Sequence, residues 1–193
     1  GRVMTTSAAG DEGDSYGWIN YSFIKKRQID LQFNPVGGEE RFWLGPEGGV
    51  FSLYFRQGEK QIYKNWKVPP VLDIEAFKIQ SQSKNCICLT KEGCLTNACG
   101  TTFYLNIKRT ISLLDINEFA ASFNLEFPKD IKAVAYKSDN QITNIGNESW
   151  NKETGLISVW MLSMFNPTSA TTVFIPYKQS RKGKIVNDEY FGK

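Results

Sequence analysis

TTFYLNIKRTISLL, residues 101–114, carries the pattern on which the fold prediction depends, because β-branched and aromatic residues dominate it. Runs of the same type recur along the chain. They are Tyr16–Ile24, Val50–Phe55, Val71–Ile79, Cys86–Thr90, Ile131–Lys137, Leu156–Met161 and Thr171–Ile175. Turn-forming residues lie between them, at Asn34–Pro35, Gly45–Pro46, Gln57–Gly58, Pro69–Pro70, Glu92–Gly93, Ser138–Asn140 and Asn166–Pro167. The sequence predicts an all-β fold, an antiparallel β-sandwich.

One helical segment is expected in this β pattern. Residues Asn117–Asn124 have helical spacing of apolar side chains, Asp115 or Asn117 is placed to cap the helix, and Pro128 follows it. Because no linker divides the chain, we expect a single β-sandwich domain over residues 1–193. Both ends interrupt strand-like sequence. We therefore expect an internal fragment of a longer chain, and an incomplete sandwich with a sheet edge or apolar face that needs a partner.

Composition excludes several classes of protein. The chain has 193 residues, a net charge of +3, 22% charged residues and no histidine. This composition is typical of a globular domain rather than of a disordered acidic chain or a nucleic-acid binder. We interpret the basic residues Lys178, Arg181, Lys182 and Lys184 as a solvated loop. No apolar run reaches the roughly 20 residues that span a bilayer, so no membrane span is expected.

The four cysteines Cys86, Cys88, Cys94 and Cys99 lie close together in the sequence. Their spacing lacks the paired knuckles of a zinc site, so we predict no bound metal. Two alternatives remain. The thiols are small buried apolar groups, or Cys88 and Cys94 form a disulfide across a turn at Lys91–Gly93 in an oxidising compartment.

The absence of histidine removes the catalytic triads and histidine-based metal sites. The chain has neither a P-loop nor a dinucleotide-binding motif, so no cofactor is expected. Carboxylates remain for proton transfer. Asp73 and Glu75, in VLDIEAFKI, would share one face of a strand with Cα atoms about 6.5 Å apart. They would form either an acid/base pair or the solvated face of that strand.

The glycine-rich stretch GGEERFWLGPEGG, residues 37–49, places an arginine and a tryptophan at alternate positions. If the backbone is extended here, Arg41 and Trp43 share one face while Phe42 and Leu44 anchor the other face in the core. Arg41 and Trp43 are then free to contact a ligand.

Glu47 follows Pro46 and is expected at the tip of a tight loop. An indole beside a guanidinium and a carboxylate suits a pyranose, whose C–H groups stack on the ring while its hydroxyls pair with the charged groups. The alternative is a rigid turn with Trp43 in the core and Glu47 in solvent.

A family resemblance covers nearly the whole chain. The chain resembles an uncharacterised bacterial domain family, which is itself similar to the galactose mutarotase-like, or aldose 1-epimerase-like, super-sandwich proteins. The segments that carry the resemblance are GRVMTT (1–6), GWINY (17–21), GGEERFWLGPEGG (37–49), LTNACGTTFYLNIKR (95–109), GLISVWMLSMF (155–165) and VNDEYFGK (186–193).

This resemblance implies a super-sandwich that holds a sugar on the concave face of a large antiparallel sheet, through Trp43, Arg41 and Glu47. It also implies a secreted or periplasmic protein of glycan utilisation. Mutarotases typically pair a histidine acid with a glutamate base, and this chain has no histidine. Mutarotase chemistry of that kind is therefore not expected, and an enzyme of this fold would be a carboxylate-based glycosidase or epimerase.

Two functions follow from these residues. The first is a carbohydrate-binding or carbohydrate-active protein, with Glu47, Asp73 and Glu75 as candidate catalytic carboxylates. Its candidate sugar-binding residues are Arg41, Trp43, Asn144, Asn147 and Trp150. The second is a non-catalytic structural β-sandwich whose aromatic residues form its core and which packs on a partner domain. The expected partners are a saccharide and the remainder of the same longer chain.

Overall fold

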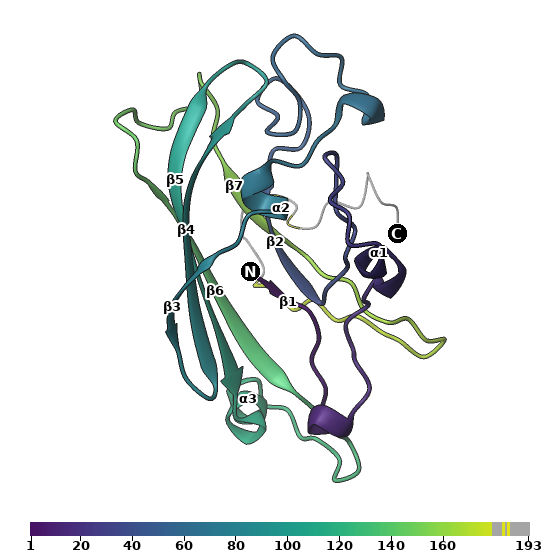
Figure 1. Cartoon of the computed structure of the whole chain (residues 1–193). Helices are drawn as coiled ribbons and strands as arrows, with labels where there is room; N and C mark the ends of the chain where they lie inside the picture. The colour runs from purple at the N-terminus through teal and green to yellow at the C-terminus, as the bar shows by residue number, and fades with distance from the viewer. Residues whose placement is uncertain (179–182, 184, 186–193) are drawn as a thin grey trace.

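The computed structural model describes residues 1–178, 183 and 185, and within them the protein is mainly β (Figure 1). Arg181, Lys182, Lys184 and the segment 186–193, which entered the sequence predictions, lie outside these residues. The strands form one four-stranded and one three-stranded antiparallel sheet. The prediction of an all-β, sandwich-like fold is confirmed.

The four-stranded sheet has the order β3-β4-β5-β6. Its strands are β3 (Lys78–Gln82), β4 (Cys86–Thr96), β5 (Thr102–Leu114) and β6 (Ala135–Asn144). Buried and exposed residues alternate along β5, as they do in a strand with one face in the core. The inner face carries apolar side chains such as Phe103, Leu105 and Ile107. The outer face is largely polar.

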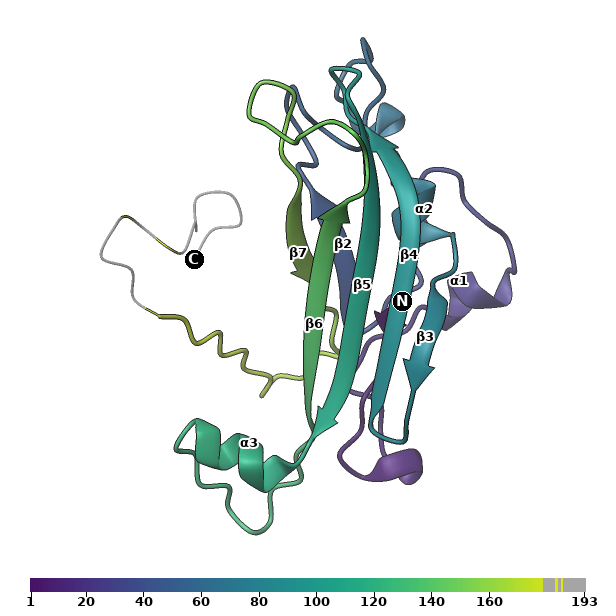
Figure 2. The same cartoon turned by 90° about the vertical axis from the view of Figure 1, so that its left-hand side faces the viewer.

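The three-stranded sheet has the order β1-β2-β7 and packs against the inner face of the larger sheet (Figure 2). It consists of β1 (Arg2–Val3), β2 (Glu40–Gly45) and β7 (Ser158–Leu162). Every residue of β2 is buried, because one of its faces meets the larger sheet and the other is covered by loops. The predicted alternation of side chains between the two faces of this strand is confirmed, since Phe42 and Leu44 lie on the opposite face from Arg41 and Trp43.

A buried ion pair joins the two sheets. Arg109 of β5 donates to Glu40 of β2, and Arg109 has no solvent exposure. Two polar residues of β6 complete the group. Ser138 Oγ donates to Glu40 Oε2 at 2.8 Å, and Arg109 Nε donates to Asn140 Oδ1 at 2.7 Å. The turn predicted at Ser138–Asn140 was therefore wrong, because these residues serve the ion pair from within a strand.

Strand β4 also runs through the turn predicted at Glu92–Gly93. A Cβ atom on Gly93 would lie 2.5 Å from Val71 Cγ2, so the glycine admits helix α2 (Pro70–Asp73) against the sheet. The turn lies instead after β4, where Asn97 accepts from the backbone N–H of Thr101 at 2.9 Å. Gly93 therefore allows α2 to approach β4 closely and does not mark a turn.

The helices are short. Helix α3 (Ile116–Ser122) confirms the predicted helix, with the Asp115 side chain accepting from the first free backbone N–H groups. Helix α1 (Tyr21–Lys25), capped by Asn20, replaces part of the strand predicted at residues 16–24. The 3₁₀ turns are η1 (Gly10–Glu12) and η2 (Tyr63–Asn65). No helix among the described residues is long and apolar enough to cross a membrane.

Three further strand predictions were wrong. Residues 71–79 contain α2 followed by only the start of β3, because Pro70 sets the first helical turn. Residues 50–55 form a loop whose Leu53 and Tyr54 are buried in the core without strand pairing. Residues 171–175 lie exposed outside both sheets. Apolar, β-branched residues occur in all three segments, but tertiary contacts decided the backbone.

All four cysteines are free thiols. The alternative of a Cys88–Cys94 disulfide was wrong, because both residues belong to one continuous strand. Six residues of strand separate their Cα atoms by about 20 Å, far beyond disulfide reach. Cys88 is buried, as the other alternative expected, whereas Cys94 is exposed.

Candidate functional site

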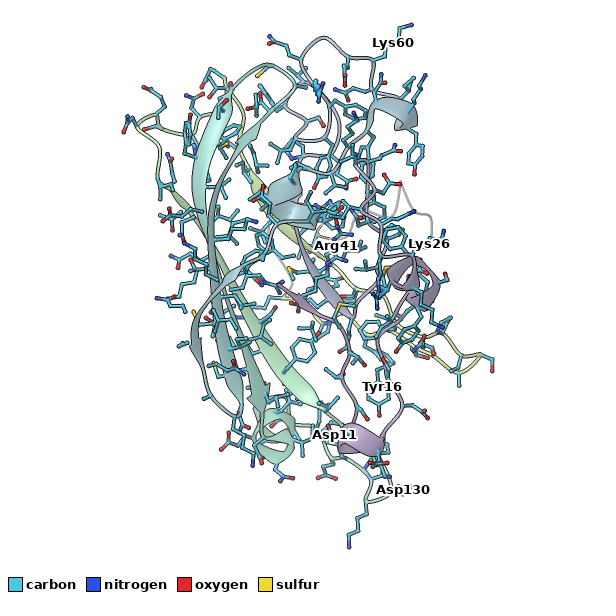
Figure 3. All side chains as sticks on the ribbon, in the orientation of Figure 1. Asp11, Tyr16, Lys26, Arg41, Lys60 and Asp130 are labelled. Atoms are coloured by element: carbon cyan, nitrogen blue, oxygen red, sulfur yellow. The ribbon has the colours of Figure 1, made fainter. Side chains whose placement is uncertain are left out.

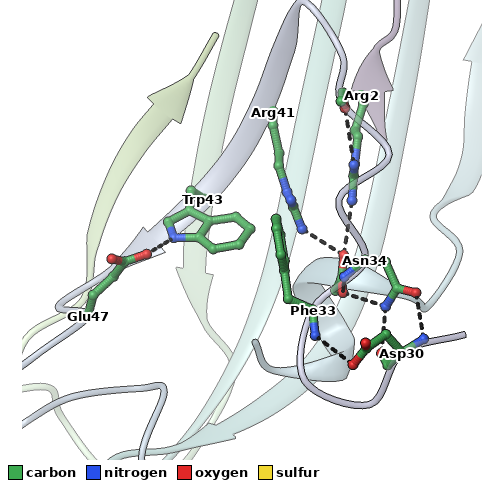
Figure 4. Close-up of polar contacts among 9 residues, drawn as sticks. Arg2, Asp30, Phe33, Asn34, Arg41, Trp43 and Glu47 are labelled. Atoms are coloured by element: carbon green, nitrogen blue, oxygen red, sulfur yellow. Dashed lines mark hydrogen bonds and ion pairs between the residues drawn. The ribbon is translucent and has the colours of Figure 1, made fainter. Parts of the chain in front are cut away.

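The predicted site residues on β2 come together, but in the interior. Arg41 has 4% and Trp43 has 2% of its surface exposed. Both point away from the four-stranded sheet toward loops that cover this face (Figures 3 and 4). The predicted freedom of Arg41 and Trp43 to contact a ligand was wrong. The alternative reading, with Trp43 in the core and Glu47 in solvent, describes their burial correctly.

Asp73 is the hub of a buried polar cluster (Figure 4). Its Oδ1 accepts from Arg41 at 2.6 Å and from Arg2 at 3.0 Å. Its Oδ2 accepts from the backbone and side-chain nitrogens of Asn34 at 2.8 and 2.7 Å. Both carboxylate oxygens are occupied, so Asp73 stabilises this cluster and is not placed to exchange protons with a substrate.

Burial also changes the titration of Arg41. Desolvation lowers the pKa of Arg41 to about 10, and repulsion from Arg2 adds to this effect while Asp73 opposes it. Two arginines share one carboxylate oxygen, so the cluster carries excess positive charge. The aromatic rings beside Arg41 partly compensate, since its guanidinium carbon lies 4.1 Å from the Trp43 ring centroid and 4.8 Å from that of Phe33.

Trp43 begins a row of four near-parallel aromatic rings that reaches the surface. Its ring stacks on Tyr54 at 5.6 Å between centroids. Tyr54 stacks on Trp66 at 5.6 Å, and Trp66 on Tyr63 at 6.2 Å. The last ring is open, because Tyr63 is 75% exposed. We call these four residues the aromatic row.

Glu47 lies beside the exposed end of this row. Its Oε1 accepts the indole Nε1–H of Trp43 at 2.6 Å, and its other carboxylate oxygen has no hydrogen-bond partner among the described residues. A surface pocket of about 310 Å³ lies here, which we call the aromatic pocket. Its lining residues are Glu47, Phe55, Gln61, Ile62, Tyr63 and Trp66. Sequence reasoning missed Tyr63 and Trp66, although each lies in a polar, turn-like segment where an aromatic residue is conspicuous.

Glu75 does not form a pair with Asp73. The expected common strand is absent, because Asp73 ends α2 and Glu75 lies after it. Glu75 instead pairs with Lys91 Nζ at 2.8 Å, and its side chain is 52% exposed. The geometry behind the predicted acid/base pair is therefore not formed.

The remaining predicted residues come together in a separate place. Asn144, Asn147 and Trp150 line a pocket of about 390 Å³ with Tyr104, which we call the loop pocket. The Asn144 amide is used within the loop, where it accepts from Gly146 N at 2.9 Å and donates to Glu148 O at 2.8 Å. The loop after β6, which lines the loop pocket, and the turn η2, which lines the aromatic pocket, lie at the same end of the sandwich (Figure 1).

No group of histidine, cysteine, aspartate and glutamate side chains suited to a metal ion is found among the described residues. The carboxylates at the predicted site are engaged by arginines, an asparagine, a lysine or an indole instead.

Comparison with known protein families assigns the chain to one of them. It belongs to the family of unknown function DUF6786, whose model matches residues 1–193. Searches of the curated proteins and of the solved structures gave no significant match.

Proposed function

We propose that the protein binds a saccharide in the aromatic pocket. The observation that carries this proposal is the exposed ring of Tyr63 at the end of the aromatic row, beside the partly free carboxylate of Glu47. A pyranose would place its C–H groups on this ring and one hydroxyl on Glu47. Gln61 lines the same pocket and supplies a second polar group, although it already bonds to Gly49.

Arg41 and Trp43 act in this proposal as positioning residues. The Trp43 indole fixes the Glu47 carboxylate through the hydrogen bond of 2.6 Å, and the Arg41 guanidinium lies over the indole. The stacking surface is then Tyr63 with Trp66, not Trp43. A rigid platform is favourable for binding because little side-chain entropy is lost when the ligand docks.

Binding is favoured over hydrolysis. Glycosidases generally use two carboxyl groups about 5–9.5 Å apart on either side of the scissile bond. The residues that line the aromatic pocket include one carboxylate, Glu47. If the pocket is catalytic, Glu47 is its acid or base, and Asp73 and Glu75 take no part in the step.

The experiment is a titration of intrinsic tryptophan fluorescence with monosaccharides and plant-type oligosaccharides, because Trp66 lines the pocket. Glu47→Gln and Tyr63→Ala should each weaken the binding of a sugar that the wild-type protein binds. Tyr104→Ala, in the loop pocket, is the matched control and should leave it unchanged. Loss of binding in Tyr104→Ala alone would instead place the sugar at Asn147 and Trp150.

A secreted or periplasmic location belongs to this proposal, because polymeric glycans are met outside the cytoplasm. Fractionation of cells that produce the native full-length protein tests it. A protein found entirely in the cytoplasmic fraction would argue against a role in capturing external glycans.

A structural module that packs on another part of its own chain is the second candidate function. The observation in its favour is that β6 and β7 each pair on one side only within the described residues. Strand β7 also exposes Val159 and Trp160 in part. Unpaired edges and apolar side chains are typical of a surface that another element covers. Failure of every sugar to bind, with protection from hydrogen exchange in a longer chain of those β7 amides that do not face β2, would favour this function.

A further inference from the structure

A third, larger pocket is lined by residues of α3, of the segment around Tyr16 and of the start of β6. Helix α3 and Tyr16 lie toward the opposite end of the molecule from η2 (Figures 1 and 3). Its volume is about 1010 Å³. We call it the Glu39 pocket. Its polar lining residues include Thr6, Asp14, Glu39, Lys132 and Tyr136. Nothing in the proposed saccharide site uses any of them.

Glu39 is the feature that distinguishes this pocket. It has only 3% of its surface exposed, yet it is among the residues that line the pocket. Its side chain is hydrogen-bonded by two residues, Thr6 and Tyr136. Thr6 donates its backbone N–H to Oε2 at 2.7 Å and its hydroxyl to the two oxygens at 2.9 and 2.8 Å.

These donors are neutral, and no cation lies within ion-pair distance of Glu39 among the described residues. The adjacent Glu40 provides the contrast, because it is paired with Arg109 on the other side of β2. A buried carboxylate without a counter-ion is costly for the folded protein. The cost falls if a positively charged ligand occupies the pocket.

The pKa of Tyr136 is also affected by the negative charge of Glu39. Burial raises the pKa of Tyr136, and Glu40 and Glu39 raise it further. The phenol therefore stays neutral and polar where it lines the pocket beside Glu39.

Aromatic side chains form much of the apolar lining, together with aliphatic residues such as Ile116 and Val134. Tyr16, Phe119, Phe127 and Phe165 contribute to the pocket wall, and the faces of such rings attract cations. Asp14 adds a second carboxylate and Lys132 a single positive charge. The lining therefore combines excess negative charge with aromatic surface, which suits an ammonium group attached to an apolar body.

We propose that the Glu39 pocket binds an organic ammonium ion, with the cationic group against Glu39 and the apolar body between the aromatic side chains. The site is independent of the aromatic pocket. A ligand at Glu39 would also stabilise the folded protein, because it would neutralise the buried carboxylate.

Isothermal titration calorimetry with three probes of similar shape tests this proposal at constant ionic strength. The probes are benzyltrimethylammonium, benzyl alcohol and benzoate. We expect the cation to bind at least tenfold more tightly than the alcohol, and benzoate to bind most weakly. Glu39→Gln, which keeps acceptor capacity for Thr6, should reduce the preference for the cation to less than twofold. Asp139→Asn, which removes an exposed carboxylate outside both pockets, is the control and should retain the full preference.

Tyr16→Leu keeps the proposal testable if Glu39→Gln does not fold, because Tyr16 is 42% exposed. This substitution should weaken the cation several-fold more than the alcohol. Equal affinities for cation and alcohol in the wild-type protein, tighter binding of benzoate, or an unchanged preference in a folded Glu39→Gln variant would each overturn the proposal. Absence of binding by all three probes would overturn it too.

Discussion

The indole Nε1 of Trp43 donates to Glu47 Oε1 at 2.6 Å, and this hydrogen bond connects the buried core to the surface of the aromatic pocket. Trp43 is fixed by its contacts with Arg41, Tyr54 and Phe33. The position of the Glu47 carboxylate therefore depends on packing inside the protein. A substitution far from solvent can consequently alter the geometry of the proposed sugar site.

Asp73→Asn should strongly destabilise the fold. The substitution leaves Arg41 and Arg2 without their shared carboxylate in a buried cluster. Breaking a buried ion pair on one side typically costs about 3–5 kcal/mol. Urea denaturation followed by circular dichroism measures the change. Asp139→Asn is the control, because Asp139 and Lys137 are both exposed and should contribute less than about 1 kcal/mol. Equal effects of the two substitutions would contradict this role of Asp73.

Gly93→Ala should destabilise the protein by about 1–3 kcal/mol, because the added methyl group would meet the stiff side chain of Val71. Val71→Ala makes room for that methyl group. The loss of stability in the double variant should therefore be smaller than the sum of the losses in the two single variants. If the two losses of stability are strictly additive, the methyl group added at Gly93 does not clash with Val71, and the close contact between α2 and β4 at this position is contradicted.

The contribution of Tyr54 to stability should fall as the pH rises above about 10. Burial raises the pKa of Tyr54 in the folded protein, while the unfolded tyrosine titrates near 10. Above that pH the folded state holds more protons, so each such group removes up to about 1.4 kcal/mol of stability per pH unit. Arg41 acts with the opposite sign, because its folded pKa is lowered to about 10.

Comparison of wild-type protein with Tyr54→Phe isolates the contribution of Tyr54. Urea denaturation at several values between pH 9 and 11 gives the slope of stability against pH. The variant should lose the Tyr54–Leu44 hydrogen bond at all pH values and show a shallower alkaline decline. Parallel slopes in the two proteins would mean that Tyr54 titrates normally.

The cysteines should differ in reactivity. Hydrogen bonding with Thr101 is the largest cause that lowers the pKa of the Cys99 thiol, which favours the reactive thiolate. Cys88 is buried and should react slowly. A brief exposure of the native protein to iodoacetamide, followed by peptide mass spectrometry, measures both. Faster labelling of Cys88 than of Cys99 would contradict the burial of Cys88 and the lowered pKa of Cys99. Recovery of a Cys88–Cys94 disulfide from the oxidised native protein would contradict the strand geometry of β4.

The sequence predicted correctly those features that depend on neighbouring residues alone. The alternation along residues 101–114 predicted β5, and Asp115 with the spacing after it predicted α3. The two faces of β2 were also predicted correctly. Each of these features needs only neighbouring residues and the period of the backbone.

Long-range contacts account for what the sequence did not reveal. Arg41 can be buried because its guanidinium donates to the carboxylate of Asp73, which lies 32 positions away in the chain. The sequence pattern of an arginine near a tryptophan is the same whether the arginine is neutralised by a ligand or by an aspartate far away in the chain. The roles of Trp66 and Tyr63 similarly depend on stacking in the folded chain, since Trp66 stacks on Tyr54 and Tyr63 stacks on Trp66.

The most direct test of the central claim is the ratio of sugar dissociation constants for Tyr63→Ala and wild-type protein, measured by titration calorimetry with the tightest-binding oligosaccharide of the panel. Stacking of this kind contributes about 1 kcal/mol, so we predict an increase of about fivefold or more in the dissociation constant. Tyr104→Ala should change it by less than twofold. An unchanged dissociation constant in Tyr63→Ala, or no binding of any saccharide by the wild-type protein, would contradict the assignment of a sugar site to the aromatic pocket.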